Sequence, residues 1–316
     1  MNVNGDGLLL QNFLYIFTKI ILPIFILVAI GFVAQRKLKM DVRTFTRVNV
    51  YIFVPVVMFT KIYTSEVGLD FVGIVVGFNL CIIASMFIIS ELASRIFKYP
   101  RGIKKAFGNS LQFYNSGNYG LPLADLAFKG SSVALAGQVF IMLIQNILTN
   151  TLGVFQASSG SSSYGKALKN ILRMPSLYML AVVLTVKGTG ISVPENLMVP
   201  LDYISNGFIA VALLTLGVQL AEIKVAFRFK DAFLASFIRL VVSPLLGYLF
   251  VTLMGIHGVL AQSLIVGVST PSAVNTAILA REFDNEPGYA SQIVLISTLL
   301  SAFTVSTVIY LVKGIA

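Results

Sequence analysis

The chain has 316 residues, of which 57% are hydrophobic and only 11% are charged, whereas charged residues make up about 25% of an ordinary soluble domain. A water-soluble fold of this size could not cover its surface with so few charges, which excludes soluble enzymes, disordered regulators and nucleic-acid binders despite the formal net charge of +10. The composition predicts an all-α polytopic membrane protein in which the basic excess reports orientation in the bilayer.

Ten mostly apolar segments follow one another along the chain, and each has about the length of 20 residues that a membrane-spanning helix needs. The fourth and ninth differ from the others because clusters of Gly, Pro, Asn, Ser and Thr interrupt their aliphatic residues. The predicted spans are residues 13–34, 44–62, 69–90, 103–127, 132–156, 171–188, 202–220, 231–254, 258–281 and 288–312.

The number of basic residues alternates between high and low from one connection to the next. With ten spans, and with basic residues near a span end counted with the adjoining connection, one side of the membrane holds 17 Lys and Arg and the other holds 4, while Lys19 and Arg239 fall inside spans. Positive charge collects on the cytoplasmic side. We therefore expect a multi-pass protein of the cell membrane with both termini outside the cytoplasm.

A weak internal repeat relates the two halves of the chain at a constant offset of 152–154 residues. Leu22-Pro23 falls on Met174-Pro175, and residues 137–141 fall on residues 291–295. Five spans per repeat is an odd number, so the second copy must enter the membrane from the opposite side, as in many secondary transporters. The predicted boundaries are a first repeat at 1–156, a cytoplasmic Ser/Gly-rich linker at 157–170 and a second repeat at 171–316.

The two interrupted spans predict a binding site. Non-helical backbone survives in a bilayer only inside protein or beside a water-filled cavity, and two such breaks at matching repeat positions indicate a site at the membrane midplane. The N-terminus of each half-helix favours an anion. The alternative is that Pro and Gly merely kink the helices while the polar side chains join them. Candidate substrate-binding residues are Asn115, Ser116, Gly117, Asn118, Thr270, Pro271, Ser272, Asn275 and Thr276.

Five further polar residues within the spans are candidates for the cavity or for coupling. Arg239 either attracts a carboxylate or reaches the cytoplasmic surface or an acidic partner such as Glu91. Asp125 either carries a coupling proton or cation or is a solvated acid beside Lys129. The polar residues of the fifth span line the cavity or join helices; they are Gln138, Gln145 and Asn146.

Cofactors and metals are not expected. The chain has a single histidine, so a His-rich metal site cannot form, and no Gly-rich phosphate loop of the GxxxxGK[ST] kind is present.

Two sequence runs carry a resemblance to a known family. NSGNYGLPLADLAFKG (residues 115–130) and STPSAVNTAILAREF (residues 269–283) resemble the crossover regions of the auxin efflux carrier family, which includes plant PIN-FORMED carriers and bacterial transporters. With the matching spacing of the other spans, the resemblance covers nearly the whole chain. In plant members a Pro precedes the substrate-facing Asn of the fourth helix, whereas here Tyr114 precedes Asn115, and a long hydrophilic central loop is absent.

The resemblance implies a fold like that of bile-acid/sodium symporters and a compact type found in the bacterial inner membrane. Spans 1, 2, 6 and 7 would form a scaffold, and spans 3–5 and 8–10 a transport domain in which the broken helices 4 and 9 cross. It also implies an organic-anion substrate such as auxin, malate or malonate, and a possible homodimer.

The function expected from these features is secondary transport of a small mono- or dicarboxylate by elevator-type alternating access. Coupling to Na⁺, to H⁺ or to neither stays open. A cation/proton antiporter or a sodium-coupled carrier of the same fold is the alternative within transport. An intramembrane enzyme would need paired Asp, Glu or His within the spans, and a channel is the other alternative.

Overall fold

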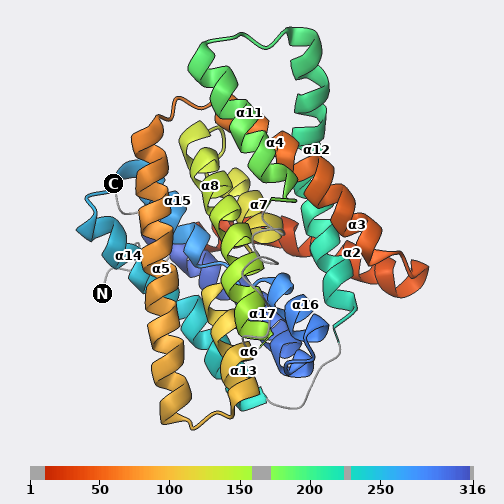
Figure 1. The fold of residues 1–316 in the computed structure, drawn as a ribbon, viewed down its shortest axis with the longest axis vertical. Helices are drawn as coiled ribbons and strands as arrows, with labels where there is room; N and C mark the ends of the chain where they lie inside the picture. Colours follow the sequence, from red (N-terminus) through yellow and green to blue (C-terminus); the bar gives the residue numbers. More distant parts are fainter. Residues whose placement is uncertain (1–10, 159–171, 224–228, 314–316) are drawn as a thin grey trace.

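The computed structural model describes residues 11–158, 172–223 and 229–313, and all regular elements in this part of the chain are helices (Figure 1). The prediction of an all-helical membrane protein is confirmed, because seven helical segments are long and apolar enough to cross a bilayer. They are Gln11–Leu38, Val42–Tyr63, Asp70–Ile96, Ser132–Ala157, Glu195–Ala221, Phe229–Leu253 and Pro287–Val312. The predicted linker at 157–170 lies almost entirely outside the described residues.

The first half of the chain contains α-helices and single turns of π-helix, the latter named η. In chain order they are η1 (Phe17–Ile21), α2 (Leu22–Leu38), α3 (Val42–Val48), η2 (Asn49–Phe53), α4 (Val54–Tyr63), α5 (Leu69–Ile96), α6 (Arg101–Gln112), η3 (Ser116–Gly120), α7 (Leu121–Ala127), α8 (Ser132–Leu148), η4 (Thr149–Gly153) and α9 (Val154–Ala157).

The described residues of the second half also form helices and one turn of π-helix. These elements are α11 (Pro175–Thr189), α12 (Glu195–Ala221), α13 (Phe229–Phe237), η5 (Ile238–Val242), α14 (Ser243–Leu253), α15 (Gly258–Val268), α16 (Val274–Glu282) and α17 (Pro287–Val312).

Three of the ten predicted spans are not among the seven long helices. The sixth corresponds to α11, which has only 15 residues, and the fourth and ninth are each divided into two shorter helices. The seventh begins earlier than predicted, at Glu195 instead of residue 202, and continues through Pro200. The earlier start of the seventh helix has a simple reason: a helix can extend past its apolar stretch. Here α11 and α12 form a hairpin that projects beyond the other helices (Figure 1).

Proline explains most of the π-helical turns. Pro23, Pro55, Pro122 and Pro244 each occupy the first or second position of an α-helix that directly follows such a turn. A proline ring clashes with the carbonyl four residues earlier and provides no N–H group. The wider π turn accommodates this clash, so the helix bends without ending.

Glycine allows a very close contact between the helices α2 and α12. A Cβ atom at Gly217 would lie 2.0 Å from the carbonyl oxygen of Val28, and one at Gly31 would lie 2.2 Å from that of Leu214. Such small residues let membrane helices approach until their backbones touch. Helix α4 packs against both α12 and α11, so α2, α4, α11 and α12 form one connected group.

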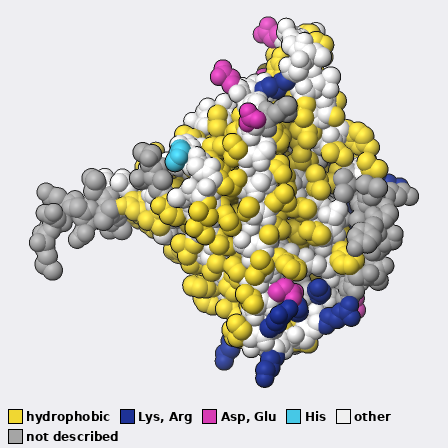
Figure 2. All heavy atoms as spheres, turned by 60° about the vertical axis from the view of Figure 1, so that its left-hand side comes forward, with side chains coloured by type: hydrophobic (Ala, Val, Ile, Leu, Met, Phe, Trp, Pro, Cys, Tyr) yellow, Lys and Arg dark blue, Asp and Glu magenta, His cyan; other side chains and the backbone are white. Residues whose placement is uncertain are grey.

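The surface has the distribution expected for a membrane protein. On the face shown in Figure 2, hydrophobic side chains cover the middle of the molecule, and several Lys and Arg gather at its lower end. Large apolar side chains such as Ile30, Leu299 and Phe303 are more than half exposed. An exposed apolar surface of this extent is suited to contact with lipid.

Candidate functional site

The two interrupted helices meet at their breaks. Helix α6 ends at Gln112 and η3 begins at Ser116, while α15 ends at Val268 and α16 begins at Val274. The non-helical residues between them pair as a single antiparallel bridge, Tyr114 with Ser272. The break that the Gly, Pro and Asn clusters predict therefore occurs in both spans, and each break contacts the other.

Main-chain groups released by one break are satisfied by the other. The Asn115 N–H donates to the Pro271 carbonyl at 2.8 Å, and the Ala273 N–H donates to the Phe113 carbonyl at 3.0 Å. The Ser272 hydroxyl adds a third link by donating to the Ser110 carbonyl at 2.7 Å. Since an unpaired backbone group in hydrocarbon costs several kcal/mol, this mutual pairing is what allows both chains to leave the helical conformation here.

A small cavity of about 70 Å³ lies next to this junction. It is large enough for several water molecules or a small polar ligand. Seven of the predicted residues line it: Asn115, Ser116, Gly117, Asn118, Gln145, Asn146 and Asn275. Asn115 is the residue before η3, and its side-chain oxygen caps this helical turn by accepting a hydrogen bond from the Asn118 N–H at 3.2 Å.

A larger cavity of about 440 Å³ adjoins the small one, with which it shares Val50, Val54, Asn146, Thr149 and Asn275. Its other lining residues include Arg173, Ser176 and Glu282. Arg173 and Glu282 are exposed, so the larger cavity connects the small one with a charged surface.

The remaining predicted residues do not line the small cavity. Thr270 and Thr276 donate to the main chain of their own segment, at the Gly267 and Ala273 carbonyls. Pro271 and Ser272 belong to the junction itself. The hydroxyl groups of Thr270, Ser272 and Thr276 thus stabilise the break by donating to main-chain carbonyls, and they do not line the small cavity.

Two of the coupling candidates have partners away from the cavity. Gln138 donates to the Ser263 carbonyl at 2.6 Å and so joins α8 to α15. Asp125 is partly exposed and lies 4.0 Å from Lys61 of α4. Both side chains thus connect neighbouring helices.

Arg239 lies in neither of the two positions that the alternatives to an anion-attracting role gave it, the surface and a pair with Glu91. It is fully buried and is not among the residues that line either cavity. The alternatives in which it reaches the surface or pairs with Glu91 are wrong, because Glu91 instead forms an ion pair with Lys104. The guanidinium binds main-chain carbonyls behind the junction, which no sequence pattern indicated.

The cavity also has lining residues that sequence reasoning missed. Asn49, at the start of η2, donates to the Asn118 side-chain oxygen at 2.8 Å. Gln219 of α12 donates to the Thr46 hydroxyl at 3.2 Å. Asn and Gln within apolar spans were the available signal, since polar side chains at membrane depth often mark function.

Several buried polar atoms around the cavity lack a partner within the described residues. They are the side-chain nitrogen of Asn115 and the side-chain oxygens of Asn49, Gln145 and Gln219. Buried polar groups are nearly always hydrogen-bonded. These atoms therefore indicate a space that is filled by water or by a ligand, and Asn115 provides a free donor for it.

The residues on the walls of this space are neutral. Among the described residues that line the small cavity there is no Asp, Glu, Lys, Arg or His. A ligand would therefore be held by amide and hydroxyl groups and by helix termini, without a full charge of the protein at contact distance.

Comparison with known proteins identifies the class. The family model described as "Membrane transport protein" matches residues 16–171 and 160–309. The chain belongs to this family, which is the auxin efflux carrier family that its crossover motifs resemble.

The chain is similar to three transporters along nearly its whole length. An "Uncharacterized transporter" of Methanothermobacter thermautotrophicus is 24% identical and covers 90% of this chain and 94% of its own. A second "Uncharacterized transporter", from Methanocaldococcus jannaschii, is 25% identical, with 91% and 96% covered. A "Putative malonate transporter" of Rhizobium meliloti is 24% identical, with 94% and 96% covered.

Proposed function

We propose that the protein is a secondary carrier for a small carboxylate, with malonate or malate as the type of substrate. The observation that carries the proposal is the free side-chain donor of Asn115, which is buried in a neutral cavity beside two interrupted helices. The similarity to a protein described as a "Putative malonate transporter" supports a dicarboxylate.

The chemistry of the cavity favours an anion over a cation. The helical segments that begin beside it, at Ser116 and Val274, present the positive ends of their dipoles. A cation would instead need carboxylates or converging oxygen ligands, and no acidic side chain is among the described lining residues. Neutral donors also suit transport, because the anion must be released as well as bound.

The proposed architecture has ten spans in two inverted repeats, with the broken helices crossing at the Tyr114–Ser272 bridge. The group formed by α2, α4, α11 and α12 would be the scaffold, and the remaining helices the transport domain. In support, the cavity is lined from both parts: Asn49 and Gln219 come from the scaffold side, and Asn115 comes from the transport side.

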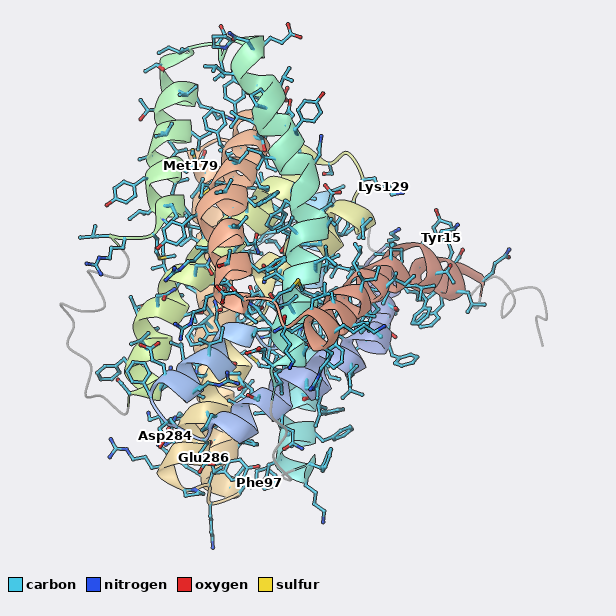
Figure 3. All side chains as sticks on the ribbon, turned by 90° about the vertical axis from the view of Figure 1, so that its right-hand side faces the viewer. Tyr15, Phe97, Lys129, Met179, Asp284 and Glu286 are labelled. Atoms are coloured by element: carbon cyan, nitrogen blue, oxygen red, sulfur yellow. The ribbon has the colours of Figure 1, made fainter. Side chains whose placement is uncertain are left out.

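The orientation that we propose has both termini outside the cytoplasm. Lys129 lies in the upper part of the molecule and Asp284 and Glu286 lie near its lower end (Figure 3), as expected if the loops that hold them are on opposite sides of the membrane. With this orientation the larger cavity faces the cytoplasm, because Arg173 and Glu282 lie on the positively charged side. The structure would then correspond to an inward-open state.

The proposal is tested by the thermal stability of the purified protein in the presence of mono- and dicarboxylates. A ligand at 100 times its dissociation constant stabilises the folded state by about 2.7 kcal/mol, so a substrate should raise the melting temperature in a saturable way. The same compound should enter proteoliposomes with saturable kinetics and without single-channel currents. Channel currents, or no stabilisation by any carboxylate, would contradict the proposal.

The charges at the entrance of the larger cavity should tune uptake without contributing to the binding site. Arg173→Gln is expected to raise the KM for a dicarboxylate several-fold at low ionic strength, because a basic side chain at the entrance attracts the anion. Glu282→Gln should lower it. Both changes in KM should be smaller in 0.5 M salt, because salt screens the interaction between the exposed side chain and the approaching anion. Arg95→Gln, on an exposed residue of α5 that does not line the cavity, is the control.

A further inference from the structure

Arg239 is a buried cation held by oxygen atoms. Its Nη1 donates to the Leu111 carbonyl at 2.9 Å, its Nε to the Thr270 carbonyl at 3.3 Å and its Nη2 to the Ser243 hydroxyl at 2.6 Å. Nη2 also donates to the Val268 carbonyl. Arg239 takes part in neither the Lys61–Asp125 nor the Lys104–Glu91 ion pair. The guanidinium is thus neutralised by dipoles rather than by an acid.

The carbonyl ligands of Arg239 come from the ends of two different helices. Leu111 lies in the last turn of α6, Val268 is the last residue of α15, and Thr270 follows it in the break. The last carbonyls of a helix have no intrahelical partner and carry the negative end of the dipole. In carriers with broken helices, such half-helix ends and unwound carbonyls are the groups that coordinate Na⁺ or H⁺.

The guanidinium therefore fills the position in which a coupling cation would be coordinated. Burial of an unpaired charge costs several kcal/mol, and here three carbonyls and one hydroxyl offset that cost. Ser243 reinforces the arrangement because its hydroxyl also donates to the Val268 carbonyl at 2.8 Å. Because these oxygen atoms already accept hydrogen bonds from Arg239, they are not available to coordinate a metal ion at the two helix ends.

Arg239 is also connected to the cavity through one side chain. Its Cζ atom lies 4.6 Å from the centre of the Tyr114 ring, a cation–π distance, and Tyr114 lines the small cavity next to Asn115. The positive charge thus lies behind the wall of the cavity, where it favours an anion without touching it.

We propose that Arg239 is a built-in cation that replaces a coupling Na⁺ at the junction of the broken helices and so makes carboxylate binding independent of sodium. This inference rests on the proposed function and adds the mode of coupling to it. Arg239 acts as a positioning residue, since it works through Tyr114 and the helix ends.

The first experiment uses the wild-type protein. Malonate affinity and uptake into proteoliposomes are measured at fixed pH in sodium and in N-methylglucamine buffers. The expected result is a difference of less than about twofold, because the oxygen ligands are already occupied. A tenfold or greater requirement for sodium would overturn the inference while leaving the carrier function intact. If no carboxylate binds in either buffer, the proposed function fails, and the experiment below, which needs no substrate, decides the inference.

The second experiment removes and then returns the cation. Arg239→Ala should lower the melting temperature, and millimolar ethylguanidinium should restore it, because the small cation can reoccupy the oxygen ligands. Arg239→Met retains side-chain bulk without charge, so it should stay destabilised and should not respond. Arg281→Ala is the matched control, since that residue is exposed and its guanidinium donates to the Glu222 carbonyl at 3.4 Å.

Recovery of Arg239→Ala by ethylguanidinium, with no change in the wild type or in Arg281→Ala, supports the inference. An equal response of all variants, or none, overturns it. If Arg239→Ala cannot be purified, the sodium measurement on the wild type decides alone.

Discussion

Replacement of Asn115 by Ala is expected to abolish carboxylate binding in the ligand-stabilisation assay. The side-chain nitrogen of Asn115 is a buried donor without a partner among the described residues, and a hydrogen bond to a charged group contributes about 1.5–3 kcal/mol. Its loss weakens binding at least about tenfold. The unliganded melting temperature should change little, because the variant loses only the bond from the Asn118 N–H, a cap worth about 1 kcal/mol.

Asn115→Asp separates binding from capping. Aspartate keeps an oxygen for the Asn118 N–H but replaces the amide donor with a negative charge, so it should bind carboxylates no better than the Ala variant although the cap is kept. Asn150→Ala is the control, because Asn150 lines the larger cavity only and donates to the Asn146 carbonyl. Normal binding by Asn115→Ala would show that the anion is recognised elsewhere.

Gly217→Ala is expected to have the largest effect on stability. The added Cβ would lie 2.0 Å from the Val28 carbonyl oxygen and 2.8 Å from the Phe32 nitrogen. Both are main-chain atoms of α2 and cannot rotate away, so the two helices would have to separate. Overpacking costs about 1–3 kcal/mol even where side chains can adjust. We therefore expect a large fall in melting temperature or loss of the folded protein.

Two other glycines provide controls for that variant. Gly188→Ala in α11 meets no atom within 4 Å, and Gly207→Ala in α12 meets only the Phe53 ring, at 3.3 Å. Both should purify as monodisperse protein with melting temperatures close to that of the wild type. A Gly217→Ala protein that melted like these controls would contradict the close packing of α2 against α12.

The interruptions of the fourth and ninth spans could be predicted because they depend on local chemistry. Pro lacks an N–H group, and Gly and Asn tolerate non-helical conformations, so a cluster of them in an apolar segment marks a break wherever the helix packs. Which side chains face the cavity depends on tertiary packing. Asn275 lines it whereas Thr276 does not, because adjacent residues of a helix point about 100° apart.

The environment of Arg239 could not be read from the sequence for a related reason. Its carbonyl ligands come from α6 and α15, which lie on either side of it in the chain. Carbonyl groups are present at every residue and so leave no mark in the sequence. The same holds for Tyr114, which appeared only as a departure from the plant pattern and yet pairs with Ser272 and covers the guanidinium.

The paired main chains at Tyr114 and Ser272 restrict how the molecule can move. Pulling the two breaks apart would remove the partners of the Asn115 and Ala273 N–H groups and of the two carbonyls that accept from them. We therefore expect the four half-helices that end or begin there to move together as one rigid unit. In the carrier that we propose, a cycle that opens the cavity to each side of the membrane in turn would move these paired main chains together with the bound anion, and the surface along which they slide would lie where α12 contacts η3.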